Sequence, residues 1–328
     1  MHDGNARPSP ATVFLAGPTA VGKSAVALAL AELLGGEIIS VDSMQVYRGL
    51  DLGTAKASAA ERARVPQHLL DVVELTEAFD AAQFVRLAQA AVKDIHSRGR
   101  VPIFCGGTGL YFKAWLEGLG EAPPSDACVR VELEAAPLAE LLVELQQRDP
   151  VTYERIDRQN PRRVIRALEV IRLTGRPFST QRAVWNAERG TRNAERVLVL
   201  SREPADLRAR IEARVDAMFA AGLVDETAAL LPHGLAANRN AMQALGYRQV
   251  VEHLRGARGL AETVALVKTK TWQFARRQGT WFRGQLRGEP VPLTPDFDLA
   301  AVAKELAGRV VTVSAVGRST VSPCSDAP

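Results

Sequence analysis

The segment GPTAVGKS contains the residues whose types and spacing most clearly indicate chemistry. Gly17, Gly22, Lys23 and Ser24 match the pattern G-x-x-x-x-G-K-[ST], in which backbone N–H groups and a lysine surround phosphate oxygens at the start of a helix. The hydroxyl at the end of this pattern binds Mg²⁺, so we expect Ser24 to be a magnesium ligand. The predicted phosphate-binding loop consists of Gly17, Pro18, Thr19, Ala20, Val21, Gly22, Lys23 and Ser24. The pattern leaves the reaction open, because kinases, ATPases and enzymes that release diphosphate all bind phosphates.

Two further residues follow apolar runs, at positions where open α/β sheets bind their ligands. Asp42 follows EIISV and is either a general base or metal-shell residue, or an aspartate that caps a turn or helix. Thr108 follows VPIFCGG and either hydrogen-bonds a substrate or caps the next helix. The run VPIFCGG ends in Cys105, Gly106 and Gly107, so it lacks the acidic residue that holds Mg²⁺ in P-loop ATPases.

The elements that must position these residues alternate between strand and helix patterns. Short apolar runs at 12–17, 37–43 and 101–107 predict buried strands, and residues 23–34 and 80–99 have helical periodicity. This alternation is typical of a parallel sheet that helices cover on both faces. We therefore predict an α/β fold with a P-loop parallel-sheet core.

The pattern changes near residue 126, and the change predicts a second domain. Helical segments separated by proline and glycine continue until the strand pattern RVLVL. We predict that residues 10–125 and 195–290 form the P-loop core, and that residues 126–194 form a helical insertion. For residues 291–328 we expect a flexible C-terminal extension.

The net charge of +4 is concentrated in two regions. Residues 153–182 contain eight arginines and three acids, and residues 268–287 contain six lysines or arginines and no acid. Aromatic residues lie between the charges of the second region, namely Trp272, Phe274, Trp281 and Phe282. This mixture is typical of nucleic-acid binding, although an amphipathic helix with an apolar core face or an anionic membrane surface would explain it as well.

The cysteines and the apolar segments indicate the cellular compartment in which the protein works. Cys105, Cys128 and Cys324 are far apart and have no CxxC spacing, so we expect neither a disulfide framework nor a zinc site. This pattern favours a reducing, cytoplasmic setting. No stretch approaches 18 uninterrupted apolar residues and the N-terminus lacks a signal-peptide pattern, so we expect no membrane association and no secretion.

Seven blocks of sequence occur in a recognisable order, namely GPTAVGKS, IISVDSMQVYRGLDLGTAK, PQHLLDVV, CGGTGLYFKAWLEGL, NPRRVIRALEV, ALGYRQ and ARRQGTWFRG. Over about residues 12–290 the chain thus resembles the tRNA dimethylallyltransferases, or isopentenylpyrophosphate:tRNA transferases, in their bacterial form. In that family a P-loop core and a helical insertion bind the anticodon stem-loop. The enzyme transfers a dimethylallyl group from its diphosphate to N6 of the adenosine 3′-adjacent to the anticodon. The resemblance implies a transferase with Mg²⁺ as cofactor and with dimethylallyl diphosphate and tRNA as substrates, and we expect a monomer.

The resemblance also implies roles for individual residues. Asp42 would accept the proton of the adenine amine, and Thr108 would lie near the adenine and the diphosphate. Either Arg210 or Arg214 would reach the diphosphate. The implied tRNA-binding residues are Asp42, Ser43, Met44, Gln45, Thr108, Arg130, Gln159, Asn160, Pro161, Arg162, Arg163, Gln243, Ala244, Leu245, Gly246, Tyr247 and Arg248.

Two other functions fit parts of the sequence. A P-loop kinase of nucleosides or other small molecules would share the phosphate-binding loop and the aspartate, but it would not need two arginine-rich regions. An NTP-dependent RNA-binding switch would need the magnesium-binding acid that is missing after the third apolar run. Phosphorylation of a small acceptor would support the first alternative, and RNA-stimulated ATP hydrolysis the second.

Overall fold

The computed structural model describes residues 12–120, 122–181, 197–286 and 288–316, with side chains up to residue 310. The chain divides into two compact units, of which the first comprises Met1–Lys113 and Arg192–Pro328 and the second Ala114–Thr191. The second unit starts earlier than the expected boundary at residue 126. The reason is local, because Arg166 donates a hydrogen bond to the carbonyl oxygen of Pro123 and Glu169 accepts one from the Ser125 hydroxyl. These bonds join the segment before residue 126 to the helices that follow it.

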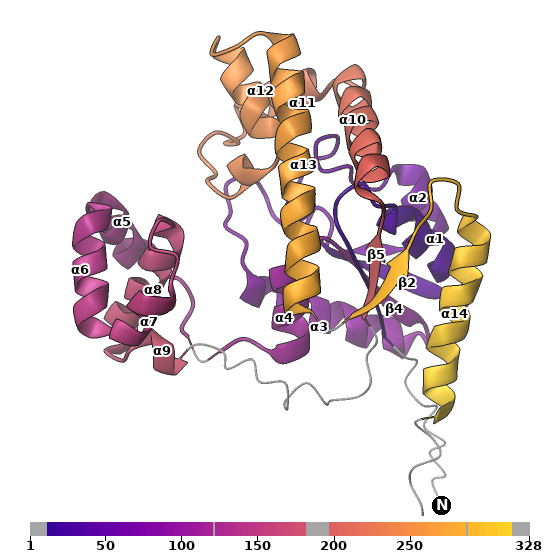
Figure 1. Ribbon diagram of the computed structural model, residues 1–328, viewed down its shortest axis with the longest axis horizontal. Coiled ribbons are helices and arrows are strands. Elements are labelled where there is room, and N and C mark those ends of the chain that lie inside the picture. The colour runs from indigo at the N-terminus through magenta and orange to yellow at the C-terminus, as the bar shows by residue number, and fades with distance from the viewer. Residues whose placement is uncertain (1–11, 121, 182–196, 287, 317–328) are drawn as a thin grey trace, which may run out of the picture. The chain divides into compact units, whose positions relative to one another are not determined.

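Within the described residues, the first unit contains a six-stranded sheet in the order β3-β2-β4-β1-β5-β6 (Figure 1). Its strands are β1 (Val13–Ala16), β2 (Gly36–Val41), β3 (Gln67–His68), β4 (Val101–Gly106), β5 (Val197–Ser201) and β6 (Gly288–Pro292). All neighbouring strands are parallel, which confirms the predicted α/β class. Gly106 is in register with Ala16 on one side and with Val41 on the other. The residues that follow β1, β2 and β4 therefore meet at one edge of the sheet.

Helices surround this sheet, and several begin at the residues that the sequence suggests. The helices of the first unit are α1 (Lys23–Leu34), α2 (Ala59–Arg64), α3 (Ala81–Ser97), α10 (Pro204–Ala220), α11 (Leu223–Leu230), α12 (Tyr247–Leu254), α13 (Leu260–Gln285) and α14 (Leu299–Val316). Helix α4 (Gly109–Glu117) starts in this unit and ends in the second. Asp80 caps α3 by accepting a hydrogen bond from the backbone of Gln83, as its position before the periodic segment predicts. The N-terminus of α10 is set by Pro204 at its first turn.

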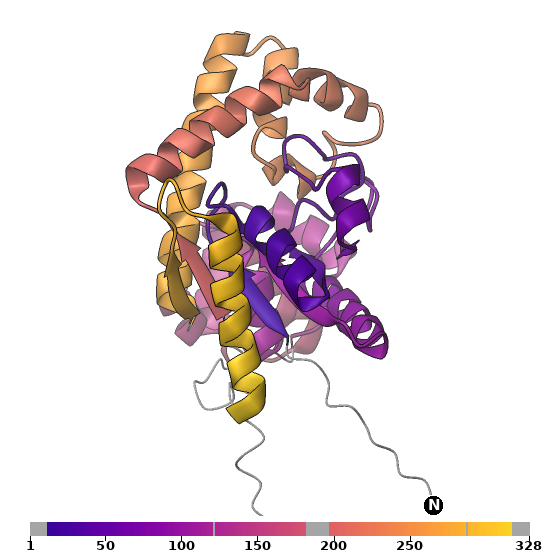
Figure 2. The same ribbon diagram turned by 90° about the vertical axis from the view of Figure 1, so that its right-hand side faces the viewer.

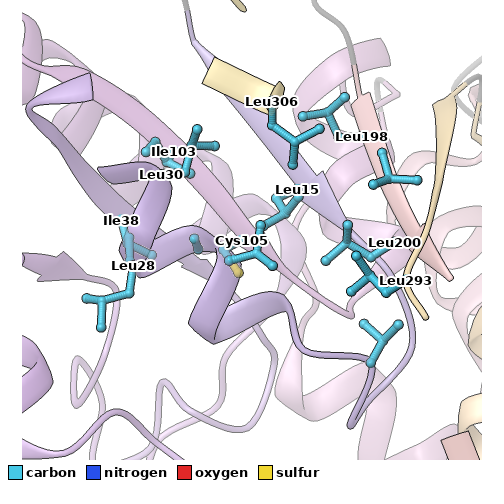
Figure 3. Packing of buried hydrophobic residues seen from close by; sticks show 14 of the residues in the cluster. Leu15, Leu28, Leu30, Ile38, Ile103, Cys105, Leu198, Leu200, Leu293 and Leu306 are labelled. Atoms are coloured by element: carbon cyan, nitrogen blue, oxygen red, sulfur yellow. The ribbon is translucent and has the colours of Figure 1, made fainter. Parts of the chain in front are cut away.

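The hydrophobic core of the first unit lies between the sheet and the helices on it. Figure 3 shows side chains of β1, β2, β4 and β5 packed against those of α1 and α14. The labelled core residues are Leu15, Leu28, Leu30, Ile38, Ile103, Cys105, Leu198, Leu200, Leu293 and Leu306. Because β1 and β4 are covered on both faces, their side chains form almost continuous apolar runs, as expected for strands in the middle of a parallel sheet.

The C-terminal segment is part of this core, so the expectation of a flexible extension from residue 291 is wrong for residues 291–316. Strand β6 pairs with β5, and α14 packs along α1 (Figure 2). Leu293 and Leu306 are buried to 4% and 0% exposure. Apolar residues in α14 recur at helical spacing and form a stripe that needs a partner. Residues 317–328, with Cys324, lie outside the described residues.

The second unit is a bundle of short helices with a core of its own. The helices are α5 (Ala127–Ala135), α6 (Leu138–Arg148), α7 (Pro150–Arg155), α8 (Pro161–Thr174) and α9 (Phe178–Gln181). Three helix starts carry side-chain caps, from Asp126, Asp149 and Asn160. Leu133 and Leu168 are fully buried between these helices. The expected end of the insertion, at residues 182–194, lies outside the described residues.

Candidate active site

The phosphate-binding loop connects β1 to α1 and borders a cavity of about 490 Å³. Gly17 has φ +152°, and a Cβ atom there would lie 2.7 Å from the carbonyl oxygen of Leu200, so this position requires glycine. The Lys23 ammonium donates to the carbonyl oxygen of Pro18 at 2.7 Å. The cavity is lined by Ala20, Gly22, Lys23, Ser24, Ala25, Glu61, Arg210, Ala213 and Arg214. Three of these side chains are cations, as a site for a polyanion requires.

The electrostatics of the cavity favour an anionic ligand. Burial lowers the pKa of Lys23 to about 8, and repulsion from Arg214 adds to this, while Cys105 and Asp42 oppose it. Burial also lowers the pKa of Arg214; attraction to Asp42 opposes this shift, and repulsion from Arg210 adds to it as the smallest cause. Both shifts arise because cations here lack the water that would solvate them. An anion placed between them would restore the lost interactions.

Arg210 and Arg214 differ in how they are held. The Nε of Arg210 donates to the carbonyl oxygen of Ala20 at 3.0 Å, and the side chain is exposed. Arg214 is half-buried, and no hydrogen bond or ion pair joins its guanidinium to any described residue. All donors of the Arg214 guanidinium are therefore available to a ligand, whereas Arg210 has already engaged its Nε.

Asp42 and Thr108 lie together at the edge of the sheet, after β2 and β4. Asp42 Oδ1 accepts hydrogen bonds from the backbone of Met44 at 2.8 Å and of Gln45 at 3.3 Å. Among the described residues Oδ2 has no partner, so the aspartate shapes its turn and still has a free oxygen. The Thr108 hydroxyl accepts from the Ser43 backbone at 3.1 Å instead of capping α4. The two alternatives for Asp42 are therefore compatible, and the hydroxyl of Thr108 positions the loop that carries Asp42.

A second cavity, of about 710 Å³, opens at this edge. Among the residues predicted to bind tRNA, those that line this cavity are Asp42, Ser43, Met44, Thr108, Gln243, Ala244, Leu245 and Arg248. Arg214 lines both cavities. The carboxylate of Asp42 and the phosphate-binding loop are therefore brought to adjoining spaces by the parallel register of β1, β2 and β4.

Three of the predicted tRNA-binding residues in the first unit do not line the second cavity. The Gln45 amide accepts from the Ser40 hydroxyl at 2.8 Å and donates to the carbonyl oxygen of Thr54 at 3.1 Å. Tyr247 is fully buried, and its hydroxyl donates to Glu226 and accepts from the backbone of Gly53. Burial and the neighbouring Glu226 carboxylate raise the pKa of Tyr247. Gln45 and Tyr247 thus hold loop 50–55 in place, and Gly246 lies buried at the start of α12.

The remaining predicted tRNA contacts lie in the second unit. Asn160 and Pro161 start α8, where Asn160 caps the backbone of Arg163 at 3.4 Å. Arg162 belongs to the first turn of α8, and Gln159 lies on the surface before it. Arg130, in α5, donates to the Ser125 hydroxyl at 3.0 Å and lies 3.8 Å from the buried Glu169 carboxylate. Part of its hydrogen-bonding capacity is therefore used within the unit.

Sequence reasoning assigned no role to several residues of α13 that line the second cavity. They are Lys270, Thr271, Phe274, Arg277 and Gln278. The basic and aromatic composition of residues 268–287 was the available signal, but it did not separate core from cavity. In the structure Phe282 is buried at 1% exposure and Trp272 packs on the core, whereas Phe274 is 38% exposed and lines the cavity. Helix periodicity divides these aromatic residues between two environments.

The fold and the site together define a P-loop α/β protein with a cavity lined by three cations next to a larger cavity. A family model described as IPP transferase matches residues 45–285. The chain belongs to the IPP transferase family, and it is a transferase.

Known proteins are similar over most of the chain. It is 48% identical over 290 residues to a tRNA dimethylallyltransferase of Halorhodospira halophila, covering 87% of this chain and 93% of the relative. A solved tRNA isopentenylpyrophosphate transferase of Bacillus halodurans shares 37% identity with a TM-score of 0.68, over 94% of this chain and 99% of that one. A eukaryotic dimethylallyltransferase acting on tRNA shares 26% identity with a TM-score of 0.75, over 96% and 81% of the two chains. Among the described residues no helix is long and apolar enough to cross a membrane.

Proposed function

We propose that this protein transfers a dimethylallyl group from dimethylallyl diphosphate to N6 of the adenosine 3′-adjacent to the anticodon in tRNA and releases diphosphate. The names of the relatives support this function. The observation that carries it is the pair of adjoining cavities that share Arg214, one with the phosphate-binding loop and the other with Asp42. A reaction between a diphosphate donor and a bulky acceptor needs these two spaces.

On the donor side, the protein stabilises the diphosphate as it leaves. Negative charge grows on the bridging oxygen when the allylic C–O bond breaks. Backbone N–H groups of the loop, Lys23 and Arg214 surround the space where that charge would develop. Because both side chains are partly desolvated, their attraction to the leaving group is stronger than it would be in water.

The residues around the donor cavity fit Mg²⁺ bound together with a diphosphate. Ser24 and Glu61 supply the hydroxyl and the carboxylate in that cavity, and the Glu61 Oε2 accepts hydrogen bonds from Ser58. Among the described residues no three His, Cys, Asp or Glu side chains are grouped to hold a metal. Mg²⁺ binds with few protein ligands when phosphate and water supply the others, so the donor set suits it. When bound, Mg²⁺ would neutralise charge on the diphosphate, and we assign Ser24 as its protein ligand.

On the acceptor side, Asp42 removes a proton. The exocyclic amine of adenine is a weak nucleophile, because its lone pair is delocalised into the ring. As the amine attacks the allylic carbon, it becomes more acidic, and a nearby carboxylate can accept the proton. The free Oδ2 of Asp42 would accept this proton. Oδ1 and the Thr108 hydroxyl keep the loop that carries Asp42 in its conformation.

The basic surfaces would bind the anticodon stem-loop. Residues Arg276, Arg277 and Trp281 line a further groove of about 630 Å³ on α13, where guanidinium groups and an indole ring suit phosphates and unstacked bases. Arg162 and Arg163, at the start of α8, would contact phosphates from the second unit. The target adenosine must leave its stack to reach the cavity. A monomer that works in the cytoplasm, where tRNA is modified, is part of this proposal.

The test is a direct product assay. Purified protein is incubated with Mg²⁺, dimethylallyl diphosphate and unmodified tRNA that has adenosines after the second anticodon position. The tRNA is then digested, and the masses of its nucleosides are measured by mass spectrometry. An adenosine heavier by one dimethylallyl group is expected, and at a fixed early time the Asp42→Asn variant should form about 10²-fold less of it. If ATP is consumed and a small acceptor is phosphorylated instead, the kinase alternative replaces this proposal.

A further inference from the structure

We propose that Gln278 is a positioning residue that couples the donor loop to the acceptor loop, and this inference rests on the proposed function. Its carboxamide lies between two loops that are far from it in sequence. Oε1 accepts a hydrogen bond from the backbone N–H of Thr19 at 2.9 Å, 259 residues away. Nε2 donates to the carbonyl oxygen of Gly107 at 2.9 Å, 171 residues away. One side chain of α13 therefore joins the phosphate-binding loop after β1 to the loop after β4.

The environment of Gln278 makes this connection rigid. The side chain is only 9% exposed and lies at the wall of the larger cavity. A Cβ atom on Gly107 would lie 2.4 Å from Nε2, so the loop approaches the amide as closely as glycine allows. A carboxamide offers one acceptor and one donor group, and the two loops require both. Glutamate in its ionised form offers only acceptors, and methionine offers neither strong donor nor strong acceptor.

The connection continues beyond Gly107 to the proton acceptor. Thr108 follows Gly107 directly, and its hydroxyl accepts the N–H of Ser43, which follows Asp42. A chain of hydrogen bonds thus runs from the donor loop through Gln278 to the turn that carries Asp42. The Asp42 turn itself is closed by the bond from Met44. Gln278 fixes the separation between the site of the leaving diphosphate and the site of proton removal.

This separation matters for the rate and less for binding. Nucleophilic substitution needs the amine nitrogen and the allylic carbon about 3–3.5 Å apart, and a misplacement of about 1 Å can cost about 10²-fold in rate. Each substrate is held mainly by its own loop, the diphosphate by the loop at 17–24 and the adenosine by the second cavity. Loss of the coupling should therefore lower the transfer rate while each substrate still binds.

The first test is the Gln278→Met variant, which has a similar shape and lacks the amide. We measure single-turnover transfer at saturating dimethylallyl diphosphate and tRNA, and the binding of tRNA and of Mg²⁺-pyrophosphate by titration. The expected result is a transfer rate about 10²-fold lower, with both dissociation constants within about threefold of wild type. A matched control is Thr263→Val on the same helix, because the buried Thr263 hydroxyl donates to the carbonyl of Gly259 at the start of that helix and has no second partner among the described residues. This control should lose some stability and keep its transfer rate.

The second test uses pH to separate positioning from general stability. In Gln278→Glu the ionised carboxylate would face the Gly107 carbonyl oxygen without a donor, whereas the protonated acid has one acceptor and one O–H donor and restores both bonds. The transfer rate of this variant relative to wild type should therefore rise as the pH is lowered. Burial and the Asp42 carboxylate raise the pKa of the introduced carboxyl, and the cations Arg214, Lys270 and Arg277, which line the same cavity, oppose this shift. The same ratio for Gln278→Met should not change with pH.

Distinct outcomes overturn the two proposals. If the wild-type protein forms no prenylated adenosine, the proposed function fails and the inference fails with it. If the wild type transfers and Gln278→Met transfers within threefold of it, the coupling role fails alone. The coupling role also fails if the loss of rate in Gln278→Met is matched by weaker binding of both substrates, or if the relative rate of Gln278→Glu is independent of pH.

Discussion

Replacing Arg214 by methionine should separate the stability of the free enzyme from its ability to bind diphosphate. Arg214 is half-buried, lines both cavities and has no hydrogen-bond partner among the described residues. Burial lowers its pKa, which means that the charged guanidinium is poorly solvated in the free enzyme. Methionine keeps much of the length of the side chain and removes the charge.

The expected loss of diphosphate binding in Arg214→Met follows from the hydrogen bonds that a diphosphate would make with Arg214. A guanidinium binds phosphate through two parallel hydrogen bonds, and a bond to a charged group is worth about 1.5–3 kcal/mol. Because Arg214 is partly exposed, we take the lower value for each bond, about 3 kcal/mol in all. This energy corresponds to a loss of about 10²-fold in kcat/KM for dimethylallyl diphosphate.

The assay measures thermal unfolding with and without Mg²⁺-pyrophosphate, together with initial rates over a range of donor concentrations. For Arg214→Met the free enzyme should unfold at an equal or slightly higher temperature, by up to about 4 °C, because an unpaired cation no longer has to be desolvated. The stabilisation by pyrophosphate should fall strongly. Arg208→Met is the matched control, since Arg208 lies on the same helix, is exposed and pairs with Glu212.

A clear result would refute this reasoning. If Arg214→Met binds pyrophosphate within threefold of wild type, then Arg214 does not contact the diphosphate. If the free variant instead unfolds several degrees lower than wild type, Arg214 serves the structure of the free enzyme, and its lack of a protein partner has been misinterpreted.

Three further predictions concern other parts of the protein. Asp42→Asn should lower kcat by about 10²-fold or more and leave tRNA binding within a few-fold, as measured by rates and filter binding; near-normal turnover would remove Asp42 from proton transfer. For Lys23, the folded pKa of about 8 lies below the ordinary value of 10.5, so the unfolded chain binds more protons between these values. The stability of the free enzyme should therefore rise with pH across this interval while diphosphate binding weakens above about pH 8, and Lys23→Met should lose both trends in urea titrations and calorimetry. Leu306→Ala should destabilise the first unit by about 2–4 kcal/mol in urea unfolding, because the side chain is fully buried between α14 and the core; an unchanged midpoint would mean that α14 does not dock in solution.

The sequence was most informative where the structure depends on neighbouring residues. The phosphate-binding loop and the start of α3 at Asp80 are local patterns, because hydrogen bonds between residues a few positions apart determine them. The prediction of a parallel sheet followed from short apolar runs that alternate with segments of helical periodicity. The same reasoning missed α14, whose apolar stripe becomes meaningful only against α1. Residue types and positions brought out Asp42 and Thr108 with two alternatives each, and the family resemblance implied their roles at the active site.

The tertiary structure decided which of these residues face the site and which support it. Register between β1, β2 and β4 brings Gly17, Asp42 and Gly107 to one edge, and only the folded chain directs Gln45 and Tyr247 inward while Arg214 faces both cavities. Gln278 joins two loops that are 171 and 259 residues away, and no local pattern encodes such a contact. The sequence by itself predicted a phosphate-binding loop at residues 17–24. The position of this loop relative to Asp42 was decided by long-range packing, because it depends on distances between segments that are remote along the chain.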